Sequence, residues 1–361
     1  MRQNRLQRTT GCRIEDGWTF QGMNVLVLQN EKLRVSLLLD KGAEIFELVY
    51  KPLDLDFMYR SSRGIRRQGT VSGFPSTNNT RFLDQYSGGW QEVFPAGSGG
   101  CEYRGALFGM HGEVALLPWD YEIIEDRKER ITVRLSVRTL RSPYLLTKDI
   151  TLVEGISALE VKEAVRNEGR VPLHFMWGHH PAFGPPFIGP ATRLDLPSCK
   201  IVSHPELYSV NSRFSPQGAL AVWPLIRDRW GNVVDLRVLR EYSCQSADML
   251  YATEMEDGWF MLTNTQIGVG IRFEWDIQTF PYLWIWNEAG GTEDYPWYGN
   301  ARVLALEPFT SLPGTGQAGL LEAIENGTAA MIEPGQTIYT SFTVTVYETH
   351  TGNETRAEMN I

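Results

Sequence analysis

The dominant pattern along the chain is an alternation of apolar and polar side chains with a period of two. In residues 131–138 every second residue is apolar, and residues 33–39 alternate before an apolar end. This alternation predicts strands that bury one face and expose the other. Further strands are predicted at residues 119–124, 145–153, 159–165, 259–263, 269–275, 282–286, 302–307 and 339–347.

Helical periodicity is scarce, and residues 317–326 are the best helix candidate. Gly, Pro, Asn and Asp cluster between the predicted strands, where they favour turns. Many short strands with few helices predict an all-β protein built as a large antiparallel sandwich or barrel. With 361 residues, 42% of them hydrophobic, the chain can bury a substantial core. We expect one domain over residues 22–348, with an N-terminal extension at 1–21 and a C-terminal tail at 349–361.

The charge pattern argues against nucleic acid or an anionic membrane as the main partner. The formal net charge is −9, and no dense stripe of Lys and Arg is present. The basic runs at residues 2–8 and 63–67 are short. We interpret them as solvated charges, although such an Arg group can also steer a phosphorylated substrate.

Cysteine usage and hydropathy predict a soluble cytoplasmic protein. The four cysteines are scattered without a C-x-x-C pair, so neither a zinc site nor a dense disulfide framework is indicated. The N-terminus lacks an apolar signal-peptide core, and no run of 18 apolar residues occurs.

Three of the six histidines lie in short apolar segments punctuated by Gly or Pro. His111 lies in residues 108–113, and His179 and His180 lie in residues 175–183. A carboxylate, Glu307, ends an apolar strand at residues 303–309. Imidazole is suited to proton transfer near neutral pH, and a buried carboxylate is a natural partner base. The pattern therefore predicts acid–base chemistry on a neutral polar substrate.

Each of these residues also has a structural interpretation. A histidine beside Gly, such as His111, is often only a hydrogen-bonded loop residue. Adjacent residues of a strand point to opposite faces, so only one of His179 and His180 can reach a given pocket. Adjacent histidines do not chelate a metal as an i, i+4 pair does, and we predict no metal site. Glu307 can instead pair with one of the arginines.

Aromatic residues are a further clue, because the chain has 11 Trp. Tyr282, Trp284 and Trp286 fall on one face of a predicted strand. Sugars pack their C–H faces on aromatic rings and need fixed polar partners for their hydroxyls. Trp90 and Gln91 are candidates for one stacking and one hydrogen-bonding group. In a sandwich of this size, such aromatic residues can equally belong to the core.

Taken in order, several segments resemble the galactose mutarotase-like superfamily, which includes the aldose 1-epimerases. The likeness extends over about residues 22–348. It is carried by the strand at 35–48 with Gly42-Ala43, the Gly-Gly-Trp-Gln-Glu-Val-Phe-Pro segment at 88–95, Met110-His111-Gly112, Asn167-Glu168-Gly169, His180-Pro181-Ala182-Phe183, Leu306-Glu307-Pro308 and Glu333-Pro334-Gly335.

The resemblance implies a β-supersandwich of large antiparallel sheets and the activity of a mutarotase on a free or phosphorylated sugar. It implies that Glu307 is the general base, that His180 is the general acid, and that His111 stabilises developing charge. No metal or organic cofactor is implied, and the partner is a small-molecule sugar, bound by a monomer or homodimer. The expected substrate-binding residues are Arg81, Trp90, Gln91, His179 and Trp286.

Two departures from the family pattern leave alternatives open. Gly184 stands where the family has Asn, and Phe309 stands where it has Gln. A non-catalytic carbohydrate-binding protein on the same fold is therefore the second hypothesis. A third is another sugar-active enzyme, such as a lyase, with Tyr298 or Arg302 as its acid or base.

Overall fold

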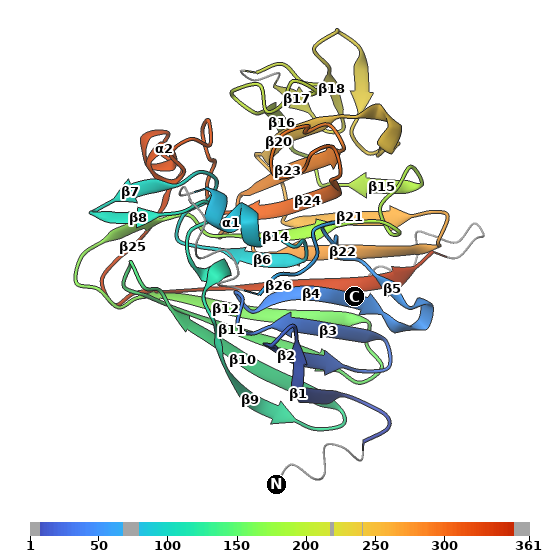
Figure 1. The fold of residues 1–361 in the computed structure, drawn as a ribbon, viewed down its shortest axis with the longest axis vertical. Helices are drawn as coiled ribbons and strands as arrows, with labels where there is room; N and C mark the ends of the chain where they lie inside the picture. Colours follow the sequence, from blue (N-terminus) through green and yellow to red (C-terminus); the bar gives the residue numbers. More distant parts are fainter. Residues whose placement is uncertain (1–7, 68–78, 217–219, 240, 350–361) are drawn as a thin grey trace.

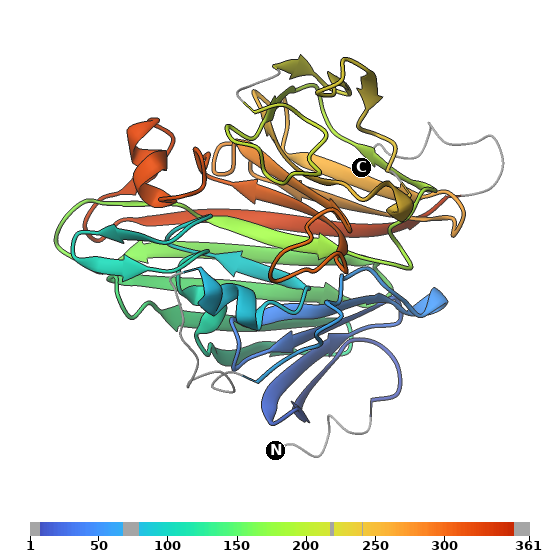
Figure 2. The same cartoon turned by 45° about the horizontal axis from the view of Figure 1, so that its top comes forward.

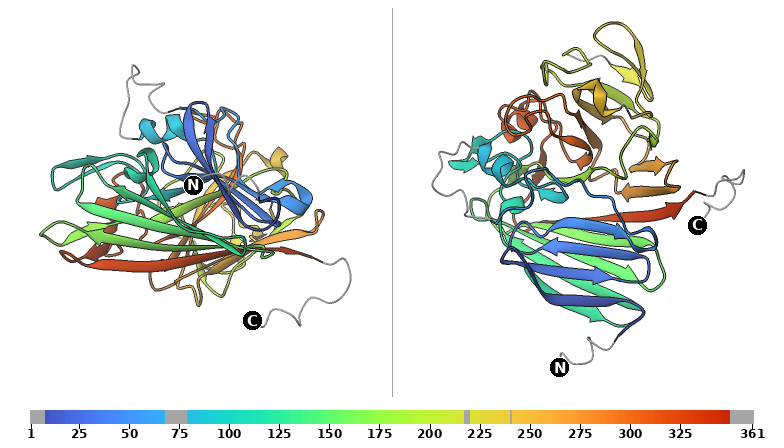
Figure 3. Two further views of the ribbon diagram at one scale, coloured as in Figure 1. Left: turned by 90° about the horizontal axis from the view of Figure 1, so that it is seen from below. Right: turned by 45° about the vertical axis from the view of Figure 1, so that its right-hand side comes forward.

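The computed structural model describes residues 8–67, 79–216, 220–239 and 241–349. Two large antiparallel sheets face each other as layers, which confirms the predicted all-β sandwich (Figures 1 and 3). The helices of the described residues are short: α1 (Thr80–Gln85), α2 (Leu320–Glu325) and the 3-10 turns η2 (Lys51–Leu53), η3 (Val114–Leu116) and η4 (Tyr242–Cys244). Within the described residues, no helix has the length and hydropathy needed to cross a membrane.

The first sheet has 12 strands and carries the functional candidates. All its strand pairs are antiparallel. Its order is β1 (Arg13–Phe20), β2 (Met23–Gln29), β3 (Leu33–Leu38), β4 (Glu44–Tyr50), β6 (Trp90–Val93), β14 (Gly178–Phe183), β24 (Arg302–Phe309), β23 (Tyr282–Ala289), β20 (Ala247–Thr253), β16 (Lys200–Ser203) and β17 (Ala221–Val222), with β5 (Leu55–Asp56) beside β4.

The second sheet has eight strands and forms the other layer. Its order is β15 (Thr192–Asp195), β21 (Trp259–Asn264), β22 (Val269–Trp275), β26 (Thr337–Glu348), β12 (Ala158–Asn167), β11 (Tyr144–Val153), β10 (Arg130–Arg138) and β9 (Asp120–Asp126). Three two-stranded sheets lie outside the layers: β7 (Cys101–Tyr103) with β8 (Ala106–Phe108), β13 (Leu173–Phe175) with β25 (Ala330–Ile332), and β18 (Leu225–Arg227) with β19 (Val233–Asp235).

The core lies between the two sheets, and the alternation in the sequence explains it. In β10, Ile131, Val133 and Leu135 are buried in the inter-sheet core, whereas Arg130 and Arg134 are exposed. The central strands β14 and β24 differ, because almost all of their residues are buried on both faces. Their second face is covered by α1 and by loops, and this cover lies toward the viewer in Figure 2.

The predicted N-terminal extension contributes to the fold. Its residues 13–20 form β1, which pairs with β2 at the edge of the 12-stranded sheet, so strand pairing starts before residue 22. The predicted helix at 317–326 is present as the shorter α2. Residues 1–7 and 350–361, which belong to the two predicted tails, lie outside the described residues.

Candidate active site

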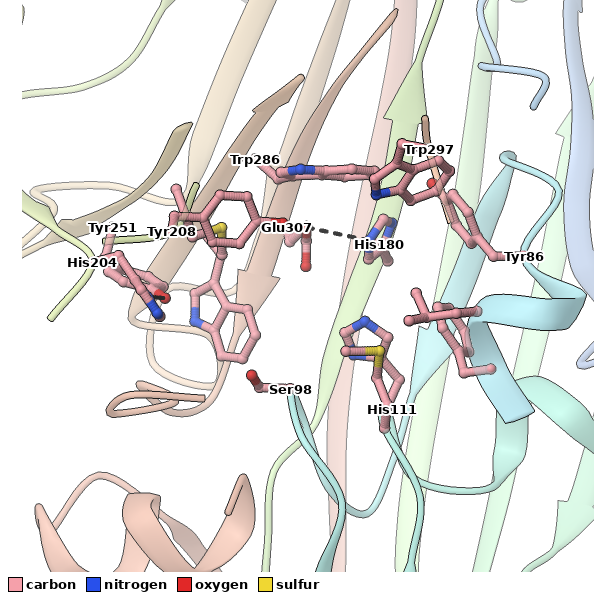
Figure 4. Close-up of a pocket in the computed structure, with 15 residues that line it drawn as sticks. Tyr86, Ser98, His111, His180, His204, Tyr208, Tyr251, Trp286, Trp297 and Glu307 are labelled. Carbon is pink, nitrogen blue, oxygen red and sulfur yellow. Dashed lines mark hydrogen bonds and ion pairs between the residues drawn. The ribbon is translucent and has the colours of Figure 1, made fainter. Parts of the chain in front are cut away.

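His180 and Glu307 face each other from neighbouring strands. The antiparallel register of β14 and β24 pairs Gly178 with Phe309 and Ala182 with Ala305, which places His180 across from Glu307. Side chains that are opposite each other project on the same face of a sheet. The His180 Nε2 and Glu307 Oε1 atoms lie 3.4 Å apart (Figure 4). Strand register alone therefore brings an imidazole and a carboxylate close together in one site.

Burial tunes both members of this pair. Glu307 is 2% exposed and His180 is 4% exposed. Burial raises the pKa of Glu307 well above its ordinary value. It lowers the pKa of His180 to about 4. Both shifts have the same physical cause, because a low-dielectric site disfavours the charged form of either group. A carboxyl whose pKa is moved toward neutrality is better matched to accept and return a proton.

His111 approaches His180 from a separate loop. Its backbone has a left-handed φ of 58°, followed by Gly112 at 76°. The His111 N–H donates a hydrogen bond to the Ser98 carbonyl at 3.1 Å. The two imidazole rings are 5.5 Å apart, between centroids. Burial and the neighbouring His180 both lower the pKa of His111, so its ring is neutral at neutral pH. A strained non-glycine backbone at such a position is typical of functional sites.

The pocket around these residues is aromatic, with about 640 Å³ of empty space that includes its opening to solvent. Figure 4 shows Tyr86, Trp286 and Trp297 close to His180, with Tyr208, Tyr251 and His204 on the opposite side. The lining residues are Phe82, Leu83, Tyr86, Ser98, Met110, His111, His180, His204, Tyr208, Met249, Tyr251, Trp284, Trp286, Trp297 and Glu307.

Four buried polar atoms in the pocket have no hydrogen-bond partner within the described residues. They are Tyr86 Oη, His111 Nδ1, His180 Nδ1 and Trp286 Nε1. A buried polar group without a partner is costly and is normally satisfied. All four belong to residues that line one pocket, which favours a ligand with several polar groups. The arrangement fits a polyhydroxylated molecule packed against aromatic rings.

Four of the five substrate-binding residues predicted from the sequence do not line this pocket. Trp90 and His179 face the inter-sheet core instead, where Trp90 Nε1 donates to His179 Nδ1 at 3.1 Å. Gln91 donates to Glu44 Oε2 at 3.0 Å within a buried polar group. Arg81 is exposed on α1. Successive residues of a strand point to opposite faces of the sheet. Because His180 faces the pocket, His179 faces away from it, and Trp90 faces the same side as His179.

Of the predicted residues, Glu307, His180, His111 and Trp286 do lie together. Sequence reasoning missed the contributions of α1 and of Tyr86, which follows it, and those of the 204–208 segment. The period-two pattern in the sequence could have identified Tyr251. Met249 and Tyr251 alternate along β20 as Trp284 and Trp286 do along β23, and the two pairs lie side by side. For Tyr86 no periodicity was available, since α1 has only six residues.

Both departures from the family pattern have a packing reason. Phe309 stacks on Trp284, with ring centroids 3.7 Å apart and planes 9° apart. At Gly184, a Cβ atom would lie 2.7 Å from Tyr59 Cα, so a larger residue does not fit. Neither position lines the pocket, and neither departure disturbs the His180–Glu307 pair. Tyr298 and Arg302, considered as lyase residues, also lie outside the lining set.

Behind His180, on the opposite face of β14, lies a buried charge cluster. We define it as Glu92, Lys148, Glu163 and His179. Lys148 Nζ contacts Glu92 Oε2 and lies 3.2 Å from Glu163 Oε1, while His179 Nε2 lies 2.9 Å from Glu163 Oε2. Glu92, Glu163 and His179 have the atom types of metal ligands. Because the Lys148 ammonium already pairs with both carboxylates, we assign the cluster to structure and not to metal binding.

Comparison with known proteins places this geometry in context. The family model described as "Domain of unknown function (DUF4432)" matches residues 20–217. No curated protein is significantly similar to the chain in sequence.

Solved structures are similar in fold. A provisionally assigned aldose 1-epimerase from Klebsiella pneumoniae has a TM-score of 0.70 and 13% identity, covering 96% of this chain and 86% of that one. A galactose mutarotase-like protein from Clostridium acetobutylicum has a TM-score of 0.62 and 12% identity, covering 94% and 99%. The Slr1438 protein from Synechocystis sp. PCC 6803 has a TM-score of 0.61 and 15% identity, covering 93% and 99%. At these identities the likeness establishes the galactose mutarotase-like fold, which confirms the resemblance seen in the sequence.

Proposed function

The chain belongs to the family described as Domain of unknown function (DUF4432); from its pocket and its fold we propose an aldose 1-epimerase-type enzyme that interconverts the α and β anomers of a sugar. The observation that most supports this proposal is that His180 and Glu307 face each other in one pocket, with His111 beside them. The fold is shared with structures named galactose mutarotase-like, which supports the same reading.

The reaction needs two proton transfers at one sugar ring. The Glu307 carboxylate takes the proton of the anomeric hydroxyl, and the bond between the anomeric carbon and the ring oxygen breaks. His180 delivers its proton to the ring oxygen, giving the open-chain aldehyde. Rotation about one C–C bond turns the other aldehyde face toward the new hydroxyl, and reversal of the two transfers closes the opposite anomer. No metal or organic cofactor takes part in these steps.

The electrostatics of the pair are compatible with this cycle. In the empty pocket, burial favours the uncharged forms of both groups. Transfer of their shared proton from carboxyl to imidazole across 3.4 Å gives the reactive ionised pair. His111 and the other unpartnered donors then stabilise charge that develops on substrate oxygens. Substrate binding excludes water and makes each of these interactions stronger.

The direct test is anomer exchange of pure anomers, followed by polarimetry or by NMR exchange spectroscopy across a panel of aldoses. We expect at least one aldose to interconvert far above the buffer rate. Calorimetric binding without any acceleration would support the carbohydrate-binding alternative instead. Unsaturated product from uronate oligomers, detected by ultraviolet absorbance, would support a lyase.

The pocket also predicts a free sugar over a phosphorylated one. No Lys or Arg occurs among the lining residues of the described chain, and Glu307 already supplies acidity. A buried charge without a partner costs several kcal/mol. We therefore expect kcat/KM for a free aldose to exceed that for its 6-phosphate by about 100-fold or more, equivalent to about 2.7 kcal/mol. Paired anomer-exchange assays of each aldose with its 6-phosphate measure this ratio, and a ratio near one contradicts the prediction.

The pH profile should report the raised pKa of Glu307. The reactive pair holds one proton in total, so kcat/KM is lost both when a second proton binds and when the single proton leaves. The second proton binds His180, whose pKa burial lowers to about 4, so we expect the acidic limb near pH 4. The single proton leaves from Glu307, whose pKa burial raises well above 4.5, so we expect the alkaline limb to report that raised pKa. Polarimetric rates from pH 3 to 9 locate the acidic limb. An acidic limb with its midpoint well above pH 4 would mean that the pair does not react through this single proton.

A further inference from the structure

Tyr86 lines the pocket and buries a phenolic hydroxyl that has no partner among the described residues. The residue follows α1 directly and is 4% exposed. Its ring meets His180 edge to face at 5.4 Å and Trp297 at 5.6 Å, between centroids. The hydroxyl oxygen is buried and has no hydrogen-bond partner among the described residues. Figure 4 shows the side chain beside His180 at the wall of the pocket.

A buried hydroxyl without a hydrogen-bond partner lowers the stability of the folded protein. Leaving such a group buried costs about 1–3 kcal/mol, whereas Phe has the same shape without the cost. Burial also raises the pKa of Tyr86 well above 10, so the group remains an O–H donor at any working pH. The native structure therefore keeps, next to the proposed acid, a neutral donor that no described residue satisfies.

The arginine that we expected to bind the sugar does not line the pocket. Arg81, the candidate for a sugar-binding arginine, is exposed on the same short helix. Five positions later, Tyr86 reaches the pocket and presents a donor of no net charge. With no Lys or Arg in the described lining, the neutral donors must bind the hydroxyls of the sugar.

We propose that Tyr86 contacts the substrate, donating its hydroxyl hydrogen to an oxygen of the sugar on the His180 side of the pocket, and so orients the ring for proton transfer. The identity of the ligand as a sugar rests on the proposed function. The contact itself rests on the unpartnered hydroxyl and its neighbours in the pocket. Tyr86 is thus a specificity residue for an uncharged hydroxyl-bearing ligand.

The test is Tyr86→Phe, with Tyr144→Phe as its matched control. Tyr144 is equally buried, but its hydroxyl donates to the His174 carbonyl at 3.3 Å and does not line the pocket. For Tyr86→Phe we expect kcat/KM to fall about tenfold while Tm is unchanged or rises, because an unsatisfied polar group is removed. For Tyr144→Phe we expect a lower Tm and unchanged kinetics.

A monodeoxy series identifies the contacted oxygen. The loss caused by Tyr86→Phe should vanish for the one deoxy sugar that lacks this hydroxyl. Unchanged kinetics and binding in Tyr86→Phe would overturn the proposal. So would a fall in Tm like that of Tyr144→Phe, because the hydroxyl would then be structural.

Binding of a 1,5-anhydro sugar, which cannot open its ring, separates this inference from the proposed function. Calorimetry should show weaker binding to Tyr86→Phe than to the wild-type protein. If the wild type binds the anhydro sugar through Tyr86 but exchanges no anomers, the mutarotase function fails and the contact stands. If the wild type exchanges anomers while Tyr86→Phe binds the anhydro sugar unchanged, the contact fails and the function stands.

Discussion

Replacing Glu307 by Gln should reduce anomer exchange by about 100- to 10,000-fold, the range typical of a lost general acid or base. Gln keeps the size and hydrogen-bonding atoms of the side chain but cannot accept the proton of the anomeric hydroxyl. The fold should not suffer, because the substitution removes a buried ionisable group whose pKa is already raised by burial. NMR exchange spectroscopy on the best aldose, together with thermal unfolding, measures both quantities.

The same experiment includes a variant of the partner residue, His180, and a control variant of an exposed carboxylate. His180→Ala should lose a similar factor, and the double variant should lose little more, since the two groups act as one unit. Glu254→Gln alters an exposed carboxylate that pairs with Lys200 at 2.6 Å, outside the pocket, and should leave the exchange rate unchanged. Wild-type rates in both Glu307→Gln and His180→Ala would remove the mutarotase assignment.

Much of the fold follows from local pattern. The alternation in 131–138 predicts β10 with its buried and exposed faces, because a half-buried strand needs that period. Glu307 was also identifiable, since a carboxylate in an apolar strand needs a partner or a function. Its pairing with His180 was not, because register between strands distant in sequence is set by the whole sheet.

The errors at the site are errors of strand parity and of short elements. Alternation indicated that His179 and His180 face opposite ways but gave no means to choose which faces the pocket. The same ambiguity placed Trp90 in a sugar site, whereas it packs in the core beside His179. Tyr86 follows a helix too short for a periodic signal. Residues contributed by short helices and loops therefore required the structure.

The buried charge cluster connects the two sheets directly behind β14, the strand that carries His180. Lys148 of β11 and Glu163 of β12 belong to one layer, and Glu92 of β6 and His179 of β14 belong to the other. His179 and Lys148 lower the pKa of Glu163 to about 2 despite its burial. A depressed carboxyl pKa contributes stability above the unfolded-state value of about 4.5, and this is lost as the pH falls toward 2.

Removing the lysine should therefore be one of the most destabilising single changes in the protein. Lys148→Met leaves Glu92 and Glu163 buried near each other without the lysine, with Trp177 Nε1 bound to Glu92 and His179 Nε2 bound to Glu163. Breaking a buried charge pair typically costs about 3–5 kcal/mol. Lys200→Met breaks the exposed pair with Glu254 and should cost less than about 1 kcal/mol. Urea unfolding at pH 7 measures both.

Combining Lys148→Met with Glu92→Gln and Glu163→Gln should recover part of the loss, because no buried charge is then left without its counterion. The same unfolding experiment at pH 3 should show a smaller difference between wild type and Lys148→Met, since Glu92, whose pKa is raised by burial, is then protonated. A Lys148→Met variant as stable as Lys200→Met would show that the cluster does not hold the two sheets together. In that case the placement of His180 would depend on the hydrogen bonding of β14 with β6 and β24 alone.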